Sequence, residues 1–152
     1  MKKNIKYTIY AVIIGIIIGK YIFYQYTKEE KMVINNTDNI IYLMQYGVYK
    51  DEKNMIESTK KLINYFYYKD EKGYHVLIGI TKNKNLKQKI VDSYGLTANI
   101  YMKGVKNNNQ EFIQSLSQYD ELIEHTKDKK IIINAQKQIL SKYEELIVNN
   151  EI

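Results

Sequence analysis

The chain has 152 residues, a length that allows one ordinary domain and a little more, but not two full domains. It contains no Cys, which excludes disulfides, thiolate zinc sites and iron–sulfur clusters, and its two His residues cannot hold a metal without help from carboxylates. The formal net charge of +6 divides into +3 over residues 1–30, +6 over residues 31–106 and −3 over residues 107–152. This uneven charge predicts a chain of three parts.

The first part has the pattern of a membrane anchor. Residues 1–6 carry three Lys, and an apolar run of 18 residues follows from Tyr7 to Tyr24, with Lys20 as its one charge. As a helix this run would be about 27 Å long, close to the hydrocarbon core of a bilayer. No small-x-small cleavage site follows it, so we predict an uncleaved signal anchor at 7–26 rather than a removed signal peptide. The Lys residues at 1–6 predict a cytoplasmic N-terminus, with the polar linker 27–38 and all later residues outside the cell.

The middle part, residues 39–106, repeats a strand–helix pattern at an offset of 32 residues. The predicted elements are a strand at 40–50, a helix at 51–63, a strand at 65–69, a strand at 74–81, a helix that ends at Gly95 and a strand at 98–103. The order βαββαβ predicts an α+β fold of the RNP or ferredoxin-like type, a four-stranded antiparallel sheet with both helices on one face. The other face of the sheet is then expected to be open.

The last part, residues 107–152, is acidic and predicts two amphipathic helices. Apolar residues recur at helical spacing from Phe112 to Ile123 and again from Ile132 to Leu146, with a polar break at 127–130. The preferred interpretation is that this helical pair docks on the basic middle part. The alternative is that it binds a protein partner.

The residues of the middle part resemble the sporulation-related repeat (SPOR) domain family. The resemblance lies in a first strand with the pattern Gln-x-Gly-x-aromatic, a third strand with the pattern aromatic-Arg-Val-x-apolar-Gly, and a Gly before the last strand. The matching residues are Gln45, Gly47, Tyr49, Tyr74, Val76, Ile78, Gly79 and Gly95. Three positions differ from the family pattern: His75 replaces an Arg, Val48 replaces a small polar residue, and Ile80–Thr81 replaces a Pro-Phe pair.

The resemblance implies a βαββαβ domain that binds peptidoglycan, with a preference for glycan strands stripped of stem peptides. It therefore predicts a membrane-anchored, extracytoplasmic protein of cell division or sporulation whose partners are glycan strands and the cell membrane. By family position, the predicted peptidoglycan-binding residues are Gln45, Val48, Tyr49, Tyr74, His75, Leu77 and Ile100. No cofactor and no metal are implied.

Several of these residues have a second interpretation from physical chemistry alone. Gln45 lies inside an apolar strand, where an unpaired amide would cost about 1–3 kcal/mol, so it bonds either within the fold or to sugar groups. His75, Leu77 and Gly79 are expected to share one strand face, on which His75 is either a sugar contact or a solvated surface residue. Ile100 is equally compatible with a place in the core.

Other classes of function are less compatible with the sequence. No nucleophile-elbow, P-loop, dinucleotide or zinc-protease motif occurs, so we expect no enzyme activity. An RNA-binding module would suit the fold and the basic charge, but the aromatic RNP pattern is missing and the anchor would place the sheet outside the cell. A non-catalytic membrane scaffold that binds a protein through its C-terminal helices is the remaining alternative.

Overall fold

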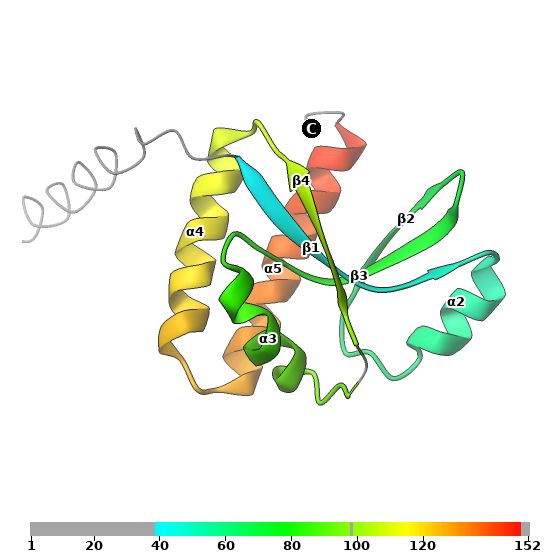
Figure 1. Ribbon diagram of the computed structural model, residues 1–152, viewed down its shortest axis with the longest axis horizontal. Coiled ribbons are helices and arrows are strands. Elements are labelled where there is room, and N and C mark those ends of the chain that lie inside the picture. Colours follow the sequence, from blue (N-terminus) through cyan, green and yellow to red (C-terminus); the bar gives the residue numbers. More distant parts are fainter. Residues whose placement is uncertain (1–38, 98, 150–152) are drawn as a thin grey trace, which may run out of the picture. The chain divides into compact units, whose positions relative to one another are not determined.

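The computed structural model describes residues 39–97 and 99–149 (Figure 1). Residues Asn39–Ile152 form a compact unit, and both hydrophobic clusters described below consist of residues of this unit. The predicted N-terminus at 1–6, anchor at 7–26 and linker at 27–38 lie outside the described residues. Within the described ranges, no helix is both long enough and apolar enough to cross a bilayer.

The predicted α+β architecture is confirmed for the sheet and for the C-terminal helical pair. The elements are β1 (Ile40–Tyr49), α2 (Glu52–Thr59), β2 (Phe66–Asp70), β3 (Gly73–Thr81), the 3₁₀ turn η1 (Lys84–Leu86), α3 (Lys87–Ser93), β4 (Tyr101–Lys106), α4 (Gln110–His125) and α5 (Lys129–Val148). The strand order is β2-β3-β1-β4, and every neighbouring pair is antiparallel. The order places β3 and β1 in the centre and β4 at one edge.

Local signals account for most of the element boundaries. The Asp51 side chain accepts from the Asn54 N–H at 2.9 Å and caps α2, as its sequence predicts. α2 ends at Thr59, four residues early, because only Met55 and Thr59 of this helix are buried and little packing supports another turn. Gly95 follows α3 with φ +66°, the left-handed conformation that favours glycine after a helix.

One face of the sheet, the α3 face, is covered by α3 and by the ends of α4 and α5. Met44 and Ile78 point to this face and are fully buried. They form a cluster with Leu86, Ile90, Val91, Ile100, Ile123, Ile132 and Ala135. Asn64, which follows α2, donates from Nδ2 to the Tyr94 hydroxyl at 2.9 Å and so joins α2 to the end of α3 on this face. The predicted placement of two helices on one face is consistent with these contacts.

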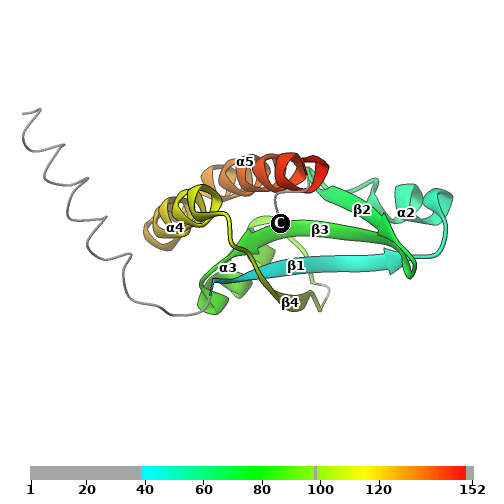
Figure 2. The same cartoon turned by 90° about the horizontal axis from the view of Figure 1, so that it is seen from above.

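The opposite face, the α5 face, was expected to be open, and that prediction is wrong over most of β3 and the first half of β1. Figure 2 shows α4 and α5 on one side of the sheet and α3 on the other. The buried cluster on the α5 face consists of Ile41, Leu43, Leu77, Ile80, Phe112, Leu116, Ile139, Leu140, Tyr143 and Leu146. Full burial of each such side chain contributes about 1.5–3 kcal/mol, which explains why the helical pair docks as preferred from the sequence.

The strands β1 and β3 are irregular where they meet, and this changes which residues share a face. Their register shifts between Met44 and Gln45 and again between Gln45 and Gly47. As a result Leu77 and Ile80, three residues apart, lie in the same cluster, whereas Ile78 belongs to the other one. The expectation that Ile78 and Ile80 share a face is therefore wrong, because strict alternation fails at the bulge.

The edge of β3 beyond its pairing with β2 is closed by the C-terminal helices. The Ile80 N–H donates to Gln136 Oε1 at 2.8 Å, and the Lys82 N–H donates to Asp120 Oδ2 at 2.7 Å. Gly79 permits the close approach of α5, because a Cβ at this position would lie 2.8 Å from the same Gln136 oxygen. The two helices therefore cover a face and complete an edge.

Candidate functional site

Three polar side chains from three strands form a hydrogen-bonded row on the α5 face, beyond the part that the helices cover. His75 of β3 lies between Asp70 of β2 and Gln45 of β1. Its Nε2 is 2.8 Å from Asp70 Oδ1, and its Nδ1 is 3.1 Å from Gln45 Oε1. Gln45 and His75 were both predicted as site residues, and the structure brings them together.

The row gives the Gln45 amide one hydrogen-bond partner within the fold, the His75 ring. Both ring nitrogens of His75 face oxygen atoms, an arrangement that a doubly protonated ring satisfies with two N–H donors. With a neutral ring, the Gln45 amide would turn so that its NH₂ donates to Nδ1. In the observed orientation Gln45 Oε1 is occupied and its NH₂ group remains available to a ligand.

The surroundings of His75 hold its ring in place. The Tyr68 ring stacks on it, with centroids 4.8 Å apart and planes 3° from parallel, and only 5% of His75 is exposed. Burial raises the pKa of Tyr68, and the nearby Asp70 charge raises it further. Desolvation raises the pKa of Asp70, but hydrogen bonds from His75 and from the N–H groups of Lys72 and Gly73 outweigh it, so this pKa lies below its usual value. The carboxylate therefore stays charged beside the ring.

Two exposed side chains flank Gln45 on the same face. Tyr101 of β4 is the cross-strand partner of Gln45 and is 63% exposed. Val48 is the cross-strand partner of His75 and is 43% exposed. Side chains of directly paired residues lie about 4.5–5.5 Å apart at Cβ, so the Tyr101 ring stands beside the half-buried Gln45 amide. We call Gln45, Val48 and Tyr101 the amide–tyrosine surface. His75 is buried beside it, so it is neither the solvated surface residue nor the direct sugar contact that the sequence analysis considered.

Tyr101 is the functional candidate that the sequence analysis missed. The last strand was predicted at 98–103, whereas β4 runs from Tyr101 to Lys106. With the strand placed three residues too early, Ile100 was taken as the outward residue by family position. Ile100 is instead 1% exposed and belongs to the cluster of the α3 face. An aromatic residue inside the predicted strand 98–103 is the signal that could have indicated Tyr101.

The remaining predicted residues do not reach the amide–tyrosine surface. Leu77 is fully buried beneath the C-terminal helices. Tyr49 lies on the α3 face, where its ring covers Gly47 and its hydroxyl bonds Ser58 of α2. Burial raises the pKa of Tyr49, which the Ser58 bond partly offsets. Tyr74 pairs with Tyr49 across the strands and is on the same face. A ligand cannot contact all seven predicted residues at once.

A second aromatic group lies on the α3 face at the end of the sheet near β2. The Tyr67 ring is 6.5 Å from the Tyr65 ring and 6.2 Å from the Tyr74 ring, measured between centroids. Lys69 Nζ lies 5.0 Å from the centroid of Tyr74, in the geometry of a cation–π contact. Tyr67 is 42% exposed, so this group is the matched comparison for Tyr101 on the opposite face.

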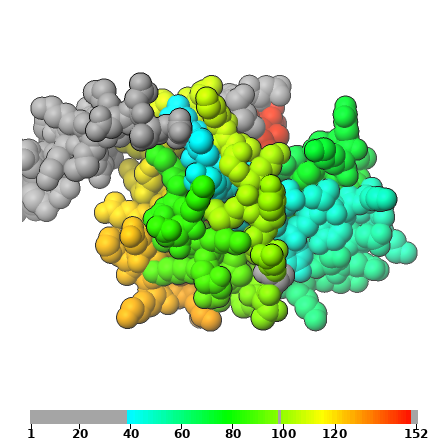
Figure 3. Space-filling view, viewed as in Figure 1, coloured from blue at the N-terminus to red at the C-terminus, as the bar shows by residue number. Residues whose placement is uncertain are grey.

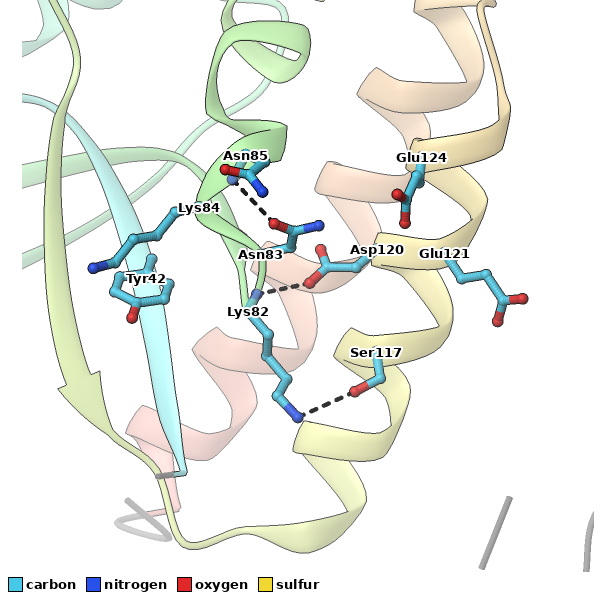
Figure 4. A pocket seen from close by; sticks show the side chains of 9 residues that line it. All are labelled: Tyr42, Lys82, Asn83, Lys84, Asn85, Ser117, Asp120, Glu121 and Glu124. Carbon is cyan, nitrogen blue, oxygen red and sulfur yellow. Dashed lines mark hydrogen bonds between the residues drawn. The ribbon is translucent and has the colours of Figure 1, made fainter. Parts of the chain in front are cut away.

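A cavity of about 620 Å³ lies between α4 and the segment that joins β3 to α3 (Figure 4). It is lined by both charge types, with Lys82 and Lys84 on one side and Glu121 and Glu124 on the other. Asp120 is 7% exposed at its base. Burial raises the pKa of Asp120 from 3.8 to about 6, although the bond from the Lys82 N–H and the nearby Thr81 hydroxyl lower it. The cavity therefore has a lining of mixed charge, with contributions from α4 and from the segment after β3.

No group of three His, Asp or Glu side chains that could hold a metal ion occurs within 39–97 and 99–149. Comparison of the chain with models of known protein families, with curated proteins and with solved structures finds no match in any of the three. The resemblance to the SPOR family remains a prediction from the sequence.

Proposed function

We propose that this protein is a non-catalytic, membrane-anchored and extracytoplasmic domain that binds peptidoglycan glycan strands at sites of cell division or sporulation. The observation that carries the proposal is the pairing of the Gln45 amide with the exposed Tyr101 ring on the uncovered end of the α5 face. The anchor at 7–26 and the place in the cell are proposals from the sequence alone.

The chemistry of the amide–tyrosine surface suits amino sugars. A pyranose ring presents an apolar face that stacks on an aromatic side chain, and its acetamido group needs hydrogen-bond donors and acceptors. Tyr101 offers the ring, and Gln45 offers an NH₂ group whose partner oxygen is already held by His75. Because the row from Asp70 fixes this amide, a sugar would meet it with little loss of side-chain entropy.

The position of the C-terminal helices limits where such a ligand can lie. They cover Leu77 and Leu43, so the strand of sugars would cross β1 and β4 near Gln45 and Tyr101 rather than the centre of the sheet. The same packing weakens the alternative of a scaffold that binds proteins through its helices. The apolar stripes of α4 and α5 are occupied by the sheet, from Phe112 to Leu146.

Pelleting of residues 39–152 with amidase-treated sacculi tests the proposal, because this unit contains its own core. We expect Tyr101→Ala and Gln45→Ala each to weaken binding roughly tenfold, since a lost stacking contact or hydrogen bond is worth about 1–1.5 kcal/mol. Tyr67→Ala is the matched control, because it removes an exposed Tyr from the opposite face. Binding should change little between low and moderate salt.

Three results would contradict the proposal. The unit could remain in the supernatant, it could pellet equally well with Tyr101→Ala, or its binding could fall steeply with salt. The last result would indicate attraction between the Lys residues and anionic wall polymers instead of sugar recognition.

A further inference from the structure

The outer edge of β4 presents backbone groups that no strand pairs with. The Asn107 N–H donates to the Asn39 carbonyl at 2.7 Å, next to the pairing of Ile40 with Lys106. In an antiparallel pair the bonded positions alternate, so Val105, Lys103 and Tyr101 also direct their backbone groups to β1. The N–H and C=O groups of Met102, Gly104 and Lys106 must then point away from the sheet.

Nothing in the described part of the chain pairs with these outward groups. β4 ends the strand order, and its residues Gly104 and Lys106 are exposed. Figure 3 shows β4, in yellow-green, on the surface of the face in view. A strand could therefore be added to this edge without displacing another element of the described fold.

A groove beside the edge supplies the side-chain environment for such a strand. It has a volume of about 540 Å³, and its lining residues include Ile40, Tyr42 and Met102. Its charged lining residues are Lys84 and Lys106, with no carboxylate among the described residues that line it. The Lys84 Nζ lies 4.7 Å from the centroid of the Tyr42 ring, which holds this charge over the groove.

We propose that β4 binds an extended acidic peptide segment of a partner protein by strand addition, with its backbone on the outward groups of Met102, Gly104 and Lys106. One alternate set of the peptide's side chains, with both apolar and acidic members, would enter the groove, where its carboxylates would meet Lys84 and Lys106. This interaction is separate from the proposed glycan binding, which uses the opposite face.

Charge and spacing select this occupant over two others. A second copy of the chain would bring the Lys residues of two β4 strands together, and like charges on paired edges disfavour such pairing. The outward N–H and C=O groups of β4 recur at every second residue. A polysaccharide has no donors and acceptors at that regular spacing, whereas a peptide strand has. An acidic peptide satisfies both the backbone and the charges.

Fluorescence anisotropy with residues 39–152 tests the proposal, with a labelled peptide of about eight residues as the probe. In this Glu–Val peptide, Val and Glu take turns at every second position, so both face the groove, and Thr fills the positions between them. Two further peptides carry N-methyl groups on one or the other alternate set of residues. We expect the unmodified peptide to bind at least tenfold more tightly than the same peptide with Lys in place of Glu. One N-methylated peptide should bind and the other should fail, because only one set of N–H groups can face β4.

The double variant Lys84→Glu, Lys106→Glu should lose at least tenfold in affinity, whereas Lys137→Glu on the exposed side of α5 should bind normally. Hydrogen exchange should show new protection at Met102, Gly104 and Lys106 when the peptide is added.

Each of three results would overturn the proposal. The Glu–Val peptide could fail to bind at millimolar concentration. Both N-methylated peptides could bind as well as the parent, which would indicate charge attraction alone. The protein could form a dimer with these three amides already protected, which would assign the edge to a second copy.

Discussion

The two edges of the sheet, at β3 and at β4, differ in what their outward backbone groups contact. Beyond Leu77, β3 has no β2 residue beside it, and side chains from Gln136 and Asp120 take up its outward N–H groups at Ile80 and Lys82. At β4, the outward groups of Met102, Gly104 and Lys106 have no such partner within the described residues.

The difference follows from where the C-terminal helices pack. They cross the α5 face and reach the β3 edge, so their polar side chains must pair with the backbone that they bury, since an unpaired buried group costs about 1–3 kcal/mol. The β4 edge is exposed to solvent, where water can satisfy the same groups. One edge is thus part of the core, and the other is an accessible surface.

The largest expected contrast is in backbone hydrogen exchange of the free protein. We expect the Ile80 and Lys82 amides to exchange at least about 100-fold more slowly than those of Met102, Gly104 and Lys106, because only the first two are held by buried acceptors. Amide exchange followed by NMR on residues 39–152 measures both groups together. The Lys103 and Val105 amides, which pair with β1, are the internal control for β4. Equal rates at Ile80 and Gly104 would refute the distinction between the edges.

The second contrast is in pH dependence at the closed edge. The pKa of Asp120 in the folded state, about 6, lies above its ordinary value of 3.8, so the folded state holds this proton more tightly than the unfolded state. Its contribution to stability is therefore fully present below about pH 4 and is lost as pH rises through about 6. The total loss is on the order of 3 kcal/mol.

Urea unfolding between pH 4 and pH 7.5 tests this expectation. Asp120→Asn should remove this fall in the free energy of unfolding between the two pH values. Glu121→Gln, at the exposed neighbour on α4, should leave the pH dependence unchanged. The interpretation fails when Asp120→Asn keeps the pH slope of the parent protein.

The smallest expected effect concerns the other side chain at the closed edge. Gln136→Ala leaves the Ile80 N–H unpaired and opens space under α5, and we expect a loss of about 2 kcal/mol in the free energy of unfolding. The loss is moderate because Gln136 Nε2 itself has no hydrogen-bond partner within the described structure. Gln138→Ala, an exposed residue two positions later, is the matched control and should change stability by less than about 0.5 kcal/mol. Equal losses in the two variants would mean that Gln136 does not hold the edge.

Much of the fold could be predicted because its signals are local. Asp51 and Gly95 mark the ends of helices through a hydrogen bond and a left-handed backbone conformation, and both were predicted correctly. The helical pair at 110–148 was visible in its apolar spacing. The face on which it docks was not, because an apolar stripe demands burial without specifying the surface that provides it.

The candidate site was predicted less well because it depends on register. Family position put Gln45 and Tyr49 in one site, which requires both on one face of β1, but the register shifts before Gly47 send Tyr49 to the other. The partner of Gln45 on β4 could not be identified before the sheet order and register were known, which is why Tyr101 was missed. His75 was identified, but its position between Asp70 and Gln45 is a product of three strands.

The close approach at Gly79 has an evolutionary consequence. A methyl group there would meet the Gln136 oxygen at 2.8 Å, so glycine at 79 and the presence of the last helix constrain each other. In a descendant that lost the C-terminal helical pair, selection would no longer hold position 79 to glycine, and larger residues should accumulate there. In a descendant that kept the pair, the two positions should be inherited together.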